Sequence, residues 1–402
     1  MMDRLGGDFR YSLSVSPFIE KMLENGARYK DETDIFACDM ESVQRLFMRH
    51  GSTEVFARIA TAKKYYGSSS NHSLEAAVKR AKLSAKLGLP LNPEINPFHY
   101  YGDIGGQPGP DFSEYPEISL SGRWHDISLA EMEEALYKFA AIVANALLET
   151  GARVNVWDIG NEINFGFAGI GLSPKPGDFE AEHGAGWYKP AVNIDPVLAD
   201  FNPDDYEAGF ADIGFLQKHV WPYEASLLNA IAEGIRSICI NAVIATHIAT
   251  VPFSIEFASA FYQAMLDFGF SPQIAGLSFY PSNPMGPEDR LGLLFDISDA
   301  LCDMGFEVFI AEYAYPAGYG ADGFFAEGWN HVSTGYPLSP NGQKDMLRDL
   351  CFKGREHGIC GVRPWAPDLV SPGWLQGSFF SLDEETKTAE ARPVINALMS
   401  TG

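Results

Sequence analysis

The sequence predicts an α/β fold, a (β/α)8 TIM barrel with enlarged loops after its fourth and seventh strands. Two observations predict it. Eight short apolar segments, rich in β-branched and aromatic residues, recur along the 402 residues of the chain, and amphipathic helical patterns lie between them. Strands that alternate with helices pair in parallel, and eight such units close this barrel. Because no Ser/Pro-rich linker or low-complexity run divides the chain, we expect residues 1–402 to form a single domain.

The expected strands are 11–16, 54–61, 91–100, 154–162, 241–249, 274–281, 307–316 and 358–367. Among the segments between them, 128–151 has the clearest helical pattern, because its apolar residues recur at steps of three and four. Ser128 and Glu131 predict a capping box at its start, and Gly151 predicts its end. Further helices are expected near 42–50, 74–87, 224–237, 254–268 and 342–358.

Two long segments hold the residues beyond the roughly 250 that the bare fold needs. They are 166–222 and 317–341, and both are rich in Gly, Pro and aromatic residues. Each follows the C-terminal end of a strand, which is the face where barrels of this kind build their sites. We expect them to form walls or lids over a cleft, and the insertion at 166–222 to bring Trp187, Tyr188 and Trp221 near the site.

The composition indicates a folded protein and limits its partners. Hydrophobic residues make up 46% of the chain, which is ample for a large core. The formal net charge of -24 repels polyanions, which argues against nucleic acid and anionic membrane surfaces as partners and favours a neutral ligand. Nothing in the sequence indicates the oligomeric state.

The cysteines and the N-terminus bear on location. The five cysteines are odd in number, widely spread and without metal-ligand spacing, so we expect free thiols in a reducing compartment. Residues 1–18 have no apolar stretch typical of a signal peptide, and no stretch approaches the roughly 20 apolar residues of a membrane span. A cytoplasmic location is the expectation, or secretion if a leader has been removed.

Two carboxylates follow apolar strands on roughly opposite sides of the predicted barrel. Glu162 ends the fourth strand, and Glu312 directly follows the apolar run 308–311 of the seventh. Residues just past the C-terminal ends of barrel strands point into a shared mouth, so the two side chains can face each other. Facing carboxylates are what cleavage of a glycosidic bond requires: one protonates the leaving oxygen, and the other attacks the anomeric carbon or activates water.

Candidate binding groups occupy the ends of most other strands. The polar ones are Arg58, His99, Tyr100, Asn161, His247 and Tyr280, and Trp365 offers a flat face on which a sugar ring can stack. Taken singly, each has an ordinary explanation: a histidine can be a hydrogen-bonded core residue, and Trp365 can plug the barrel. Their agreement is more informative, because polar groups at the same end of nearly every strand are costly to bury without a purpose.

Several motifs resemble those of a known enzyme class. WDIGNEINFG, GLSFYP, IAEYAYP and GVRPWAP are similar to motifs of clan A of the glycoside hydrolases, and within it of family 53, the endo-β-1,4-galactanases. In that family a strand ending in IGNEINNG carries the acid/base glutamate, and one ending in ETAYP carries the nucleophile. The resemblance covers most of the chain, because SPFIEKMLENGARYKDE, PFHYYGD, GYPLSPNGQKDMLRDL and the terminal GSFFSLDEETKTAEARPVI also match in order.

The resemblance implies a role for each matched residue. Glu162 would be the acid/base and Glu312 the nucleophile. Asn161 would hold the sugar 2-hydroxyl, Tyr280 would lie beside the nucleophile, and Arg58 would be the guanidinium of the second strand. The expected reaction is hydrolysis with retention through a covalent glycosyl-enzyme. Retention requires carboxyl groups about 5 to 5.5 Å apart, against roughly 6.5 to 9.5 Å for inversion.

Departures from the family leave the substrate open. Ile104 stands in the region where the family usually places a Trp, and 166–222 is longer than the corresponding family loop. β-1,4-Galactan, or oligosaccharides derived from it, is the default substrate. The alternatives are another clan A glycosidase, namely a β-mannanase, a xylanase or an exo-acting β-galactosidase-like enzyme, and a catalytically silent glycan-binding barrel.

No cofactor is expected, since the sequence has no Gly-rich nucleotide-binding motif. Some members of the family hold calcium in the region of 317–341. Asp322 and Glu327 offer two oxygen ligands there, which is fewer than the roughly six to eight that calcium takes.

Overall fold

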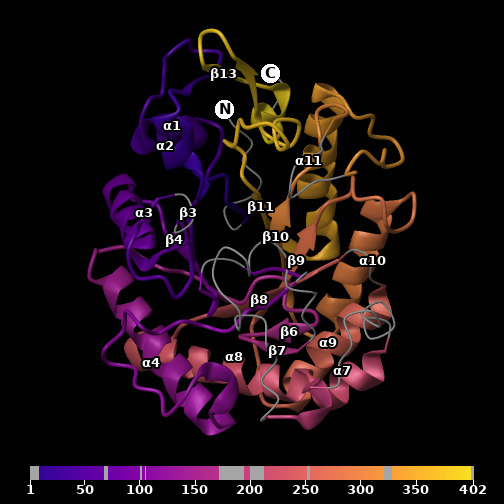
Figure 1. Ribbon diagram of the computed structural model, residues 1–402. Helices are drawn as coiled ribbons and strands as arrows, with labels where there is room; N and C mark the ends of the chain where they lie inside the picture. Colours follow the sequence, from indigo (N-terminus) through magenta and orange to yellow (C-terminus); the bar gives the residue numbers. More distant parts are fainter. Residues whose placement is uncertain are drawn as a thin grey trace.

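The computed structural model of the chain describes residues 9–67, 71–99, 102–104, 106–171, 194–199, 212–250, 254–320 and 328–399. Eight parallel strands form one sheet in the order β1-β11-β10-β9-β8-β5-β4-β3, which curls into the barrel at the centre of Figure 1. Their bounds are Arg10–Tyr11 (β1), Val55–Ile59 (β3), Leu91–Ile95 (β4), Trp157–Ile159 (β5), Ile244–Ala249 (β8), Ile274–Phe279 (β9), Glu307–Tyr313 (β10) and Ile359–Pro364 (β11). Seven predicted strands are present with shorter bounds, the first shares only Tyr11 with β1, and the predicted (β/α)8 barrel is confirmed.

The barrel closes between β1 and β3, through bonds that continue beyond the short β1. The Thr53 N–H donates to the Tyr11 carbonyl oxygen at 2.9 Å, and the Phe56 N–H donates to the Ser14 hydroxyl oxygen at 2.9 Å. On the other side, the Ser12 N–H donates to the Val362 carbonyl oxygen of β11 at 2.9 Å. The segment predicted as the first strand therefore bridges its two neighbours, with regular pairing in its first residues alone.

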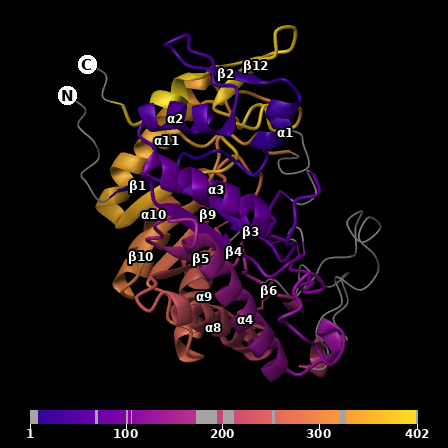
Figure 2. The ribbon, with the colours of Figure 1, turned by 90° about the vertical axis from the view of Figure 1, so that its left-hand side faces the viewer.

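Helices cover the outside of the barrel, and Figure 2 shows α3 and α4 lying over β3, β4 and β5. The outer helices are α2 (Met40–Arg49), α3 (Leu74–Leu87), α4 (Leu129–Leu148), α8 (Trp221–Ile238), α9 (Ile255–Asp267), α10 (Arg290–Asp303) and α11 (Pro340–Gly354). All six predicted helices are among them. Helix α10 is an addition to the prediction, although Leu291, Leu294 and Leu301 have helical spacing and are buried against the sheet.

The start of α4 differs from the prediction in one detail. The Ser128 hydroxyl oxygen accepts from the Glu131 N–H at 3.3 Å and so caps the helix. The Glu131 carboxylate does not complete the capping box, because it accepts instead from the N–H (2.5 Å) and the hydroxyl (2.7 Å) of Ser121. The preceding loop competes successfully for that carboxylate, and the predicted capping box is half formed.

The last strand of the barrel is followed by a small sheet. Within the described chain, two strands, β12 (Phe380–Asp383) and β13 (Thr388–Ala391), stand where the fold class predicts an eighth α-helix. Strand β13 pairs in parallel with β2 (Arg28–Lys30), so this sheet joins the C-terminal part of the chain to the N-terminal part. Figures 1 and 2 both place it with α1 (Ile19–Glu24) at one end of the molecule.

The predicted insertion at 166–222 begins with a tight hairpin. Strand β6 (Gly166–Phe167) pairs antiparallel with β7 (Ile170–Gly171), directly after β5. A Cβ on Gly171 would lie 2.3 Å from the Phe165 carbonyl oxygen, so the close approach of the two strands requires glycine there. Trp187 and Tyr188, which were expected near the site, lie outside the described residues.

Trp221, which was also expected near the site, is a core residue. It follows α7 (Ile213–His219), begins α8, and is fully buried with its ring edge-on to Phe257 and Phe261. Its indole N–H donates to the Asn164 carbonyl oxygen at 3.0 Å. The ring therefore anchors the start of α8 to the chain after β5.

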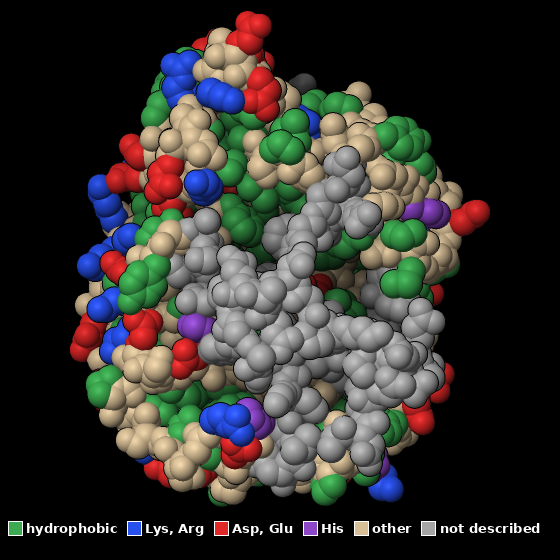
Figure 3. All heavy atoms as spheres, in the orientation of Figure 1, with side chains coloured by type: hydrophobic (Ala, Val, Ile, Leu, Met, Phe, Trp, Pro, Cys, Tyr) green, Lys and Arg blue, Asp and Glu red, His purple; other side chains and the backbone are tan. Residues whose placement is uncertain are grey.

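The surface of the described residues agrees with the charged, acidic composition of the chain. No helix among the described residues is long and apolar enough to cross a membrane. Figure 3 shows acidic and basic side chains interspersed along the rim of one face, and its coloured residues form no continuous basic field. Together with the net charge of -24, this favours uncharged ligands over polyanions.

Candidate active site

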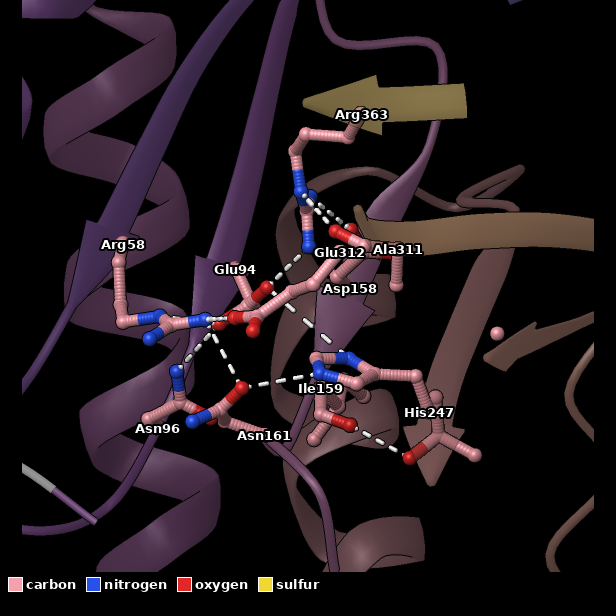
Figure 4. A network of polar contacts seen from close by, with 12 residues as sticks. Arg58, Glu94, Asn96, Asp158, Ile159, Asn161, His247, Ala311, Glu312 and Arg363 are labelled. Atoms are coloured by element: carbon pink, nitrogen blue, oxygen red, sulfur yellow. Dashed lines mark hydrogen bonds and ion pairs between the residues drawn. The ribbon is translucent and has the colours of Figure 1, made fainter. Parts of the chain in front are cut away.

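Polar side chains point into the barrel from strands that are otherwise apolar. On β4, Asn92 and Glu94 alternate with residues that pack toward the helices, as the period of two of a strand requires. Asn92 Oδ1 accepts from Arg363 of β11 at 2.9 Å, and Glu94 Oε1 accepts from Arg58 of β3 at 2.5 Å. Figure 4 shows Arg58, Glu94 and Arg363 converging with Glu312 inside the barrel.

Glu312 reaches the barrel mouth through a β-bulge in β10. Ile310 pairs with Leu277 and Glu312 pairs with Ser278, so β10 uses two residues where β9 uses one. The extra residue is Ala311, which packs in the small apolar cluster inside the barrel. If Ala311 continued the regular alternation of the strand, Glu312 would point toward the helices, as Ile310 does. The bulge therefore places this carboxylate over the barrel interior.

Two donors hold the Glu312 carboxylate. Arg58 Nη2 donates to Oε1, and the Tyr280 hydroxyl donates to Oε2 at 2.5 Å. Burial raises the pKa of Glu312, while the Arg58 charge and the Tyr280 hydrogen bond oppose the rise because both favour the ionised form. The resemblance placed Tyr280 beside this glutamate, and the structure brings both Tyr280 and Arg58 there.

Glu162 lies three residues beyond the end of β5, with a positive φ of 51° that few non-glycine residues adopt. Its Oε2 accepts from the Ile104 N–H at 3.4 Å. Burial, followed by the charges of Glu312 and Asp103, raises the pKa of Glu162 to about 8, against a smaller opposing effect of the Ser278 hydroxyl. The carboxyl therefore keeps its proton at neutral pH.

The two glutamates lie near each other, since Arg58 Nη2 donates both to Glu312 and to Asn161, the residue before Glu162, and the charge of Glu312 raises the pKa of Glu162. Neither is turned to bulk solvent: 8% of Glu162 and 5% of Glu312 is exposed. One carboxyl lacks a strong donor and holds a proton, and the other lies between a guanidinium and a phenol. That pairing suits one group to give a proton and the other to act as an anion.

Asn161 links the chain after β5 to β3, to β8 and to the loop after β4. Its Oδ1 accepts from Arg58 Nη2 at 2.8 Å and from His247 Nε2 at 2.9 Å, and its Nδ2 donates to the Gly102 carbonyl oxygen at 2.8 Å. Burial lowers the pKa of His247 to about 3, so the ring is neutral and carries its proton on Nε2. A Cβ on Gly276 would lie 2.4 Å from the His247 Cβ, so glycine there makes room for the ring.

Known structures share this barrel. A catalytic domain of glycoside hydrolase family 53 from Ignisphaera aggregans is 19% identical, with a TM-score of 0.68 over 99% of this chain and 98% of that one. A structure of fungal β-1,4-galactanases is 17% identical, with a TM-score of 0.67 over 97% and 99%. The catalytic core of xylanase A is 12% identical, with a TM-score of 0.52 over 97% of each. At such identities the likeness shows the fold.

The sequence comparison is more specific. No curated protein sequence matches the chain. The sequence model of glycosyl hydrolase family 53 matches residues 202–401. The chain is a glycoside hydrolase similar to family 53. The matched part of the hydrolase contains Glu312 and Tyr280, whereas Glu162 precedes it and is joined to them by the geometry of the barrel mouth.

Trp365 is placed beside the nucleophile candidate of the hydrolase, but it is buried. The Arg58 guanidinium lies over its ring, 4.3 Å from the centroid, and Phe18 and Phe56 meet it edge-on. Only 4% of the residue is exposed. The ring supports Arg58, and stacking of a sugar on its other face stays a prediction.

The remaining predictions concern His99, Tyr100 and the candidate calcium ligands. His99 pairs with Asp111, with 3.6 Å between Nε2 and Oδ2, in the loop between β4 and α4. Tyr100 and the candidate calcium ligands Asp322 and Glu327 lie outside the described residues.

The candidate metal cluster among the described residues lies away from the active site of the hydrolase. It consists of Asp31, Glu32 and His50, near the small sheet. Asp31 Oδ2 already accepts from Arg49 at 2.7 Å and contacts His50 Nε2 at 3.1 Å. The Arg49 guanidinium therefore supplies the positive charge that a metal ion would bring.

An ion network that was not predicted from the sequence lies under the two glutamates of the hydrolase. It is formed by Glu94, Arg363 and Asp158. Trp329, whose ring packs on Tyr280 with 4.7 Å between centroids, was not predicted either. The sequence does indicate the first three, because each is a charged residue inside an otherwise apolar strand. In such a strand, side chains point alternately to the helices and to the barrel interior. Trp329 comes from the loop after β10, where the sequence has no regular pattern.

Proposed function

We propose that the protein is a retaining endo-β-1,4-galactanase, acting on β-1,4-galactan or on oligosaccharides derived from it. The observation that carries this is the contrast between two buried carboxyl groups in one site. Burial and neighbouring charges raise the pKa of Glu162 to about 8, and Glu312 accepts from Arg58 and Tyr280. Retaining glycosidases need this pairing of a protonated acid and an anionic nucleophile.

In the first step, the Glu312 carboxylate attacks the anomeric carbon while the bond from that carbon to the leaving oxygen breaks. Glu162 gives its proton to the leaving oxygen, and a glycosyl ester on Glu312 forms. In the second step, Glu162, now a carboxylate, takes a proton from water as the water oxygen attacks the same carbon. The ester bond breaks, Glu312 is released as a carboxylate and Glu162 is again protonated.

Arg58 and Tyr280 act throughout on the nucleophile. Their hydrogen bonds to Glu312 hold its oxygens in place and stabilise the carboxylate that attacks and later leaves. Asn161 is held by Arg58, His247 and Gly102 next to Glu162, and its amide has a second N–H that can donate to the sugar 2-hydroxyl.

The substrate proposal has two supports. The sequence model of family 53 matches the half of the chain that carries Glu312, and β-1,4-galactanases share the barrel along its whole length. The net charge of -24 suits an uncharged polysaccharide.

The decisive experiment reads stereochemistry and residue roles together. The protein is incubated with linear β-1,4-galactan, and the anomers of the first products are followed by NMR; β products support retention, and α products contradict the glycosyl-enzyme. Glu312→Ala and Glu162→Ala are then tested on an activated aryl β-galactobioside with azide. Azide that replaces Glu312 attacks from the α face and gives an α-azide, whereas azide that attacks the glycosyl-enzyme of Glu162→Ala gives a β-azide.

Cleavage of β-mannan or xylan in place of galactan, with the same two azide products, would keep the mechanism and replace the substrate. Wild-type protein that cleaves none of these glycans would overturn the proposal and favour a glycan-binding barrel.

A further inference from the structure

Five charged side chains form an unbroken line inside the barrel, with alternating signs, that ends at the candidate nucleophile (Figure 4). Asp158 Oδ2 accepts from Arg363 Nη1 at 2.8 Å, and Arg363 Nη2 donates to Glu94 Oε2. Glu94 Oε1 accepts from Arg58 Nε at 2.5 Å, and Arg58 Nη2 donates to Glu312. All five side chains are buried, so each pair interacts with little screening by water.

Glu94 is the centre of this line. Each of its oxygens accepts from a different arginine, and Oε1 also accepts from Asn96 Nδ2 at 2.8 Å. Burial by itself would raise the pKa of Glu94, but the charges of Arg58 and Arg363 outweigh it and lower the pKa to about 2. The carboxylate is therefore ionised over the whole range in which a glycosidase works.

We propose that Glu94 is a positioning residue for the candidate nucleophile, acting through Arg58. The guanidinium is planar and rigid, so a group that holds Nε fixes the direction of Nη2. Here Glu94 holds Nε, and Nη2 is thereby aimed at both Glu312 Oε1 and Asn161 Oδ1. This inference rests on the proposed function, in which Glu312 attacks the sugar.

Glu94 also acts on Glu312 by charge. The groups that face Glu312 are Arg58 from β3, Glu94 from β4, Glu162 after β5 and Tyr280 after β9. His247 of β8 faces Glu94 and is neutral. The negative charge of Glu94 raises the pKa of Glu312 and offsets part of the effect of Arg58. Removing that charge should lower the pKa of Glu312.

The test is Glu94→Gln, with Glu54→Gln as the matched control. Glu54 is also a buried carboxylate bonded twice to an arginine, with 3.1 and 3.0 Å to Arg10, but no hydrogen bond or ion pair links that pair to Glu94, Arg58 or Glu312. The readouts are kcat, KM and the pH profile of kcat/KM on galactan. We expect Glu94→Gln to lower kcat about 10- to 100-fold with KM nearly unchanged, because the nucleophile is misaimed.

The acidic limb of the pH profile distinguishes the proposal from a merely structural role of Glu94, because a structural role would not move it. It should move to lower pH in Glu94→Gln and stay in place in Glu54→Gln. An unmoved limb in Glu94→Gln, or equal shifts in both variants, would overturn the proposal.

If Glu94→Gln does not fold, Glu94→Asp keeps the charge but is too short to reach both arginines. Its kcat should fall while its acidic limb stays, and a wild-type kcat would overturn the proposal. Failure of the proposed function is seen separately, because wild-type protein would then cleave none of the glycans, or Glu312→Ala would retain wild-type activity, whatever the Glu94 variants do.

Discussion

Glu312 lies on a strand and owes its direction to a β-bulge in that strand, whereas Glu162 lies in a loop three residues beyond the end of its strand. Two side chains, Arg58 and Tyr280, donate to Glu312. Glu162 accepts a long backbone hydrogen bond of 3.4 Å from Ile104. The same residue type thus meets two environments within one site.

These two environments explain how one barrel mouth can supply an acid and an anion at the same pH. A buried carboxyl without strong donors keeps its proton, because ionisation would leave a charge in a poorly solvated place. A buried carboxyl between a guanidinium and a phenol can ionise, because its charge is compensated. Each charge also acts on the other group, since ionised Glu312 makes the proton on Glu162 harder to remove.

The largest effect that separates the two glutamates should come from the leaving group of the substrate. Glu162→Gln cannot protonate the leaving oxygen, so hydrolysis of galactan should slow by about 10²- to 10⁴-fold. A 2,4-dinitrophenyl β-galactobioside needs no proton to depart, so its first step should survive. The second step still lacks a base, and the expected result is a stoichiometric burst of dinitrophenolate followed by slow turnover, measured by stopped-flow absorbance.

Glu312→Gln is the matched control for that burst. It removes the nucleophile, so no burst of dinitrophenolate should appear with the aryl substrate, and galactan should not be hydrolysed. A burst in Glu312→Gln but not in Glu162→Gln would reverse the two assignments.

The two glutamates were easier to predict from the sequence than the residues around them. Both stand beside strongly apolar strands, and the strand count alone places them at the same end of the barrel. The bulge at Ala311 left no mark in the sequence, because an inserted residue in an apolar run looks like any other apolar residue. Glu94 was missed although it lies within the predicted strand 91–100, where Asn92, Glu94 and Asn96 keep a period of two, because site residues were expected at the end of that strand.

Partners from distant strands were beyond sequence reasoning. Arg58 and Glu312 are 254 positions apart, and their contact depends on how the barrel closes. Asp103 is the last residue of PFHYYGD, one of the motifs of the resemblance, yet its effect on the pKa of Glu162 depends on the course of the loop after β4. Motifs located the catalytic candidates, while the charges that tune them required the assembled barrel.

The next effect concerns stability. The pKa of Glu162 is about 8 in the folded protein against an ordinary value of 4.5, so the folded state binds this proton more tightly. The stability that the proton contributes is complete below about pH 4.5 and is lost as the pH rises toward and through 8. Glutamine has no proton to lose. Relative to wild type, Glu162→Gln should therefore gain about 3 kcal/mol in free energy of unfolding between pH 4 and pH 7, measured with urea.

Glu134→Gln, at an exposed position of α4, serves as the control and should change the free energy of unfolding little at either pH. If Glu162→Gln differs from wild type by the same amount at pH 4 and pH 7, Glu162 does not hold a proton in the folded state, and the contrast between the two glutamates fails.

The smallest effect tests the phenol on Glu312. Tyr280→Phe removes the 2.5 Å hydrogen bond to Oε2, which should lower kcat/KM about tenfold, since hydrogen bonds to charged groups contribute about 1.5 to 3 kcal/mol. Tyr313→Phe is the control, because the Tyr313 hydroxyl is buried without a hydrogen-bond partner and its loss should leave activity unchanged. Removing the phenol also destabilises the Glu312 carboxylate, so the acidic limb should move to higher pH, opposite to its expected movement in Glu94→Gln. Movement of the limb in the same direction in both variants would show that it reports a group other than Glu312.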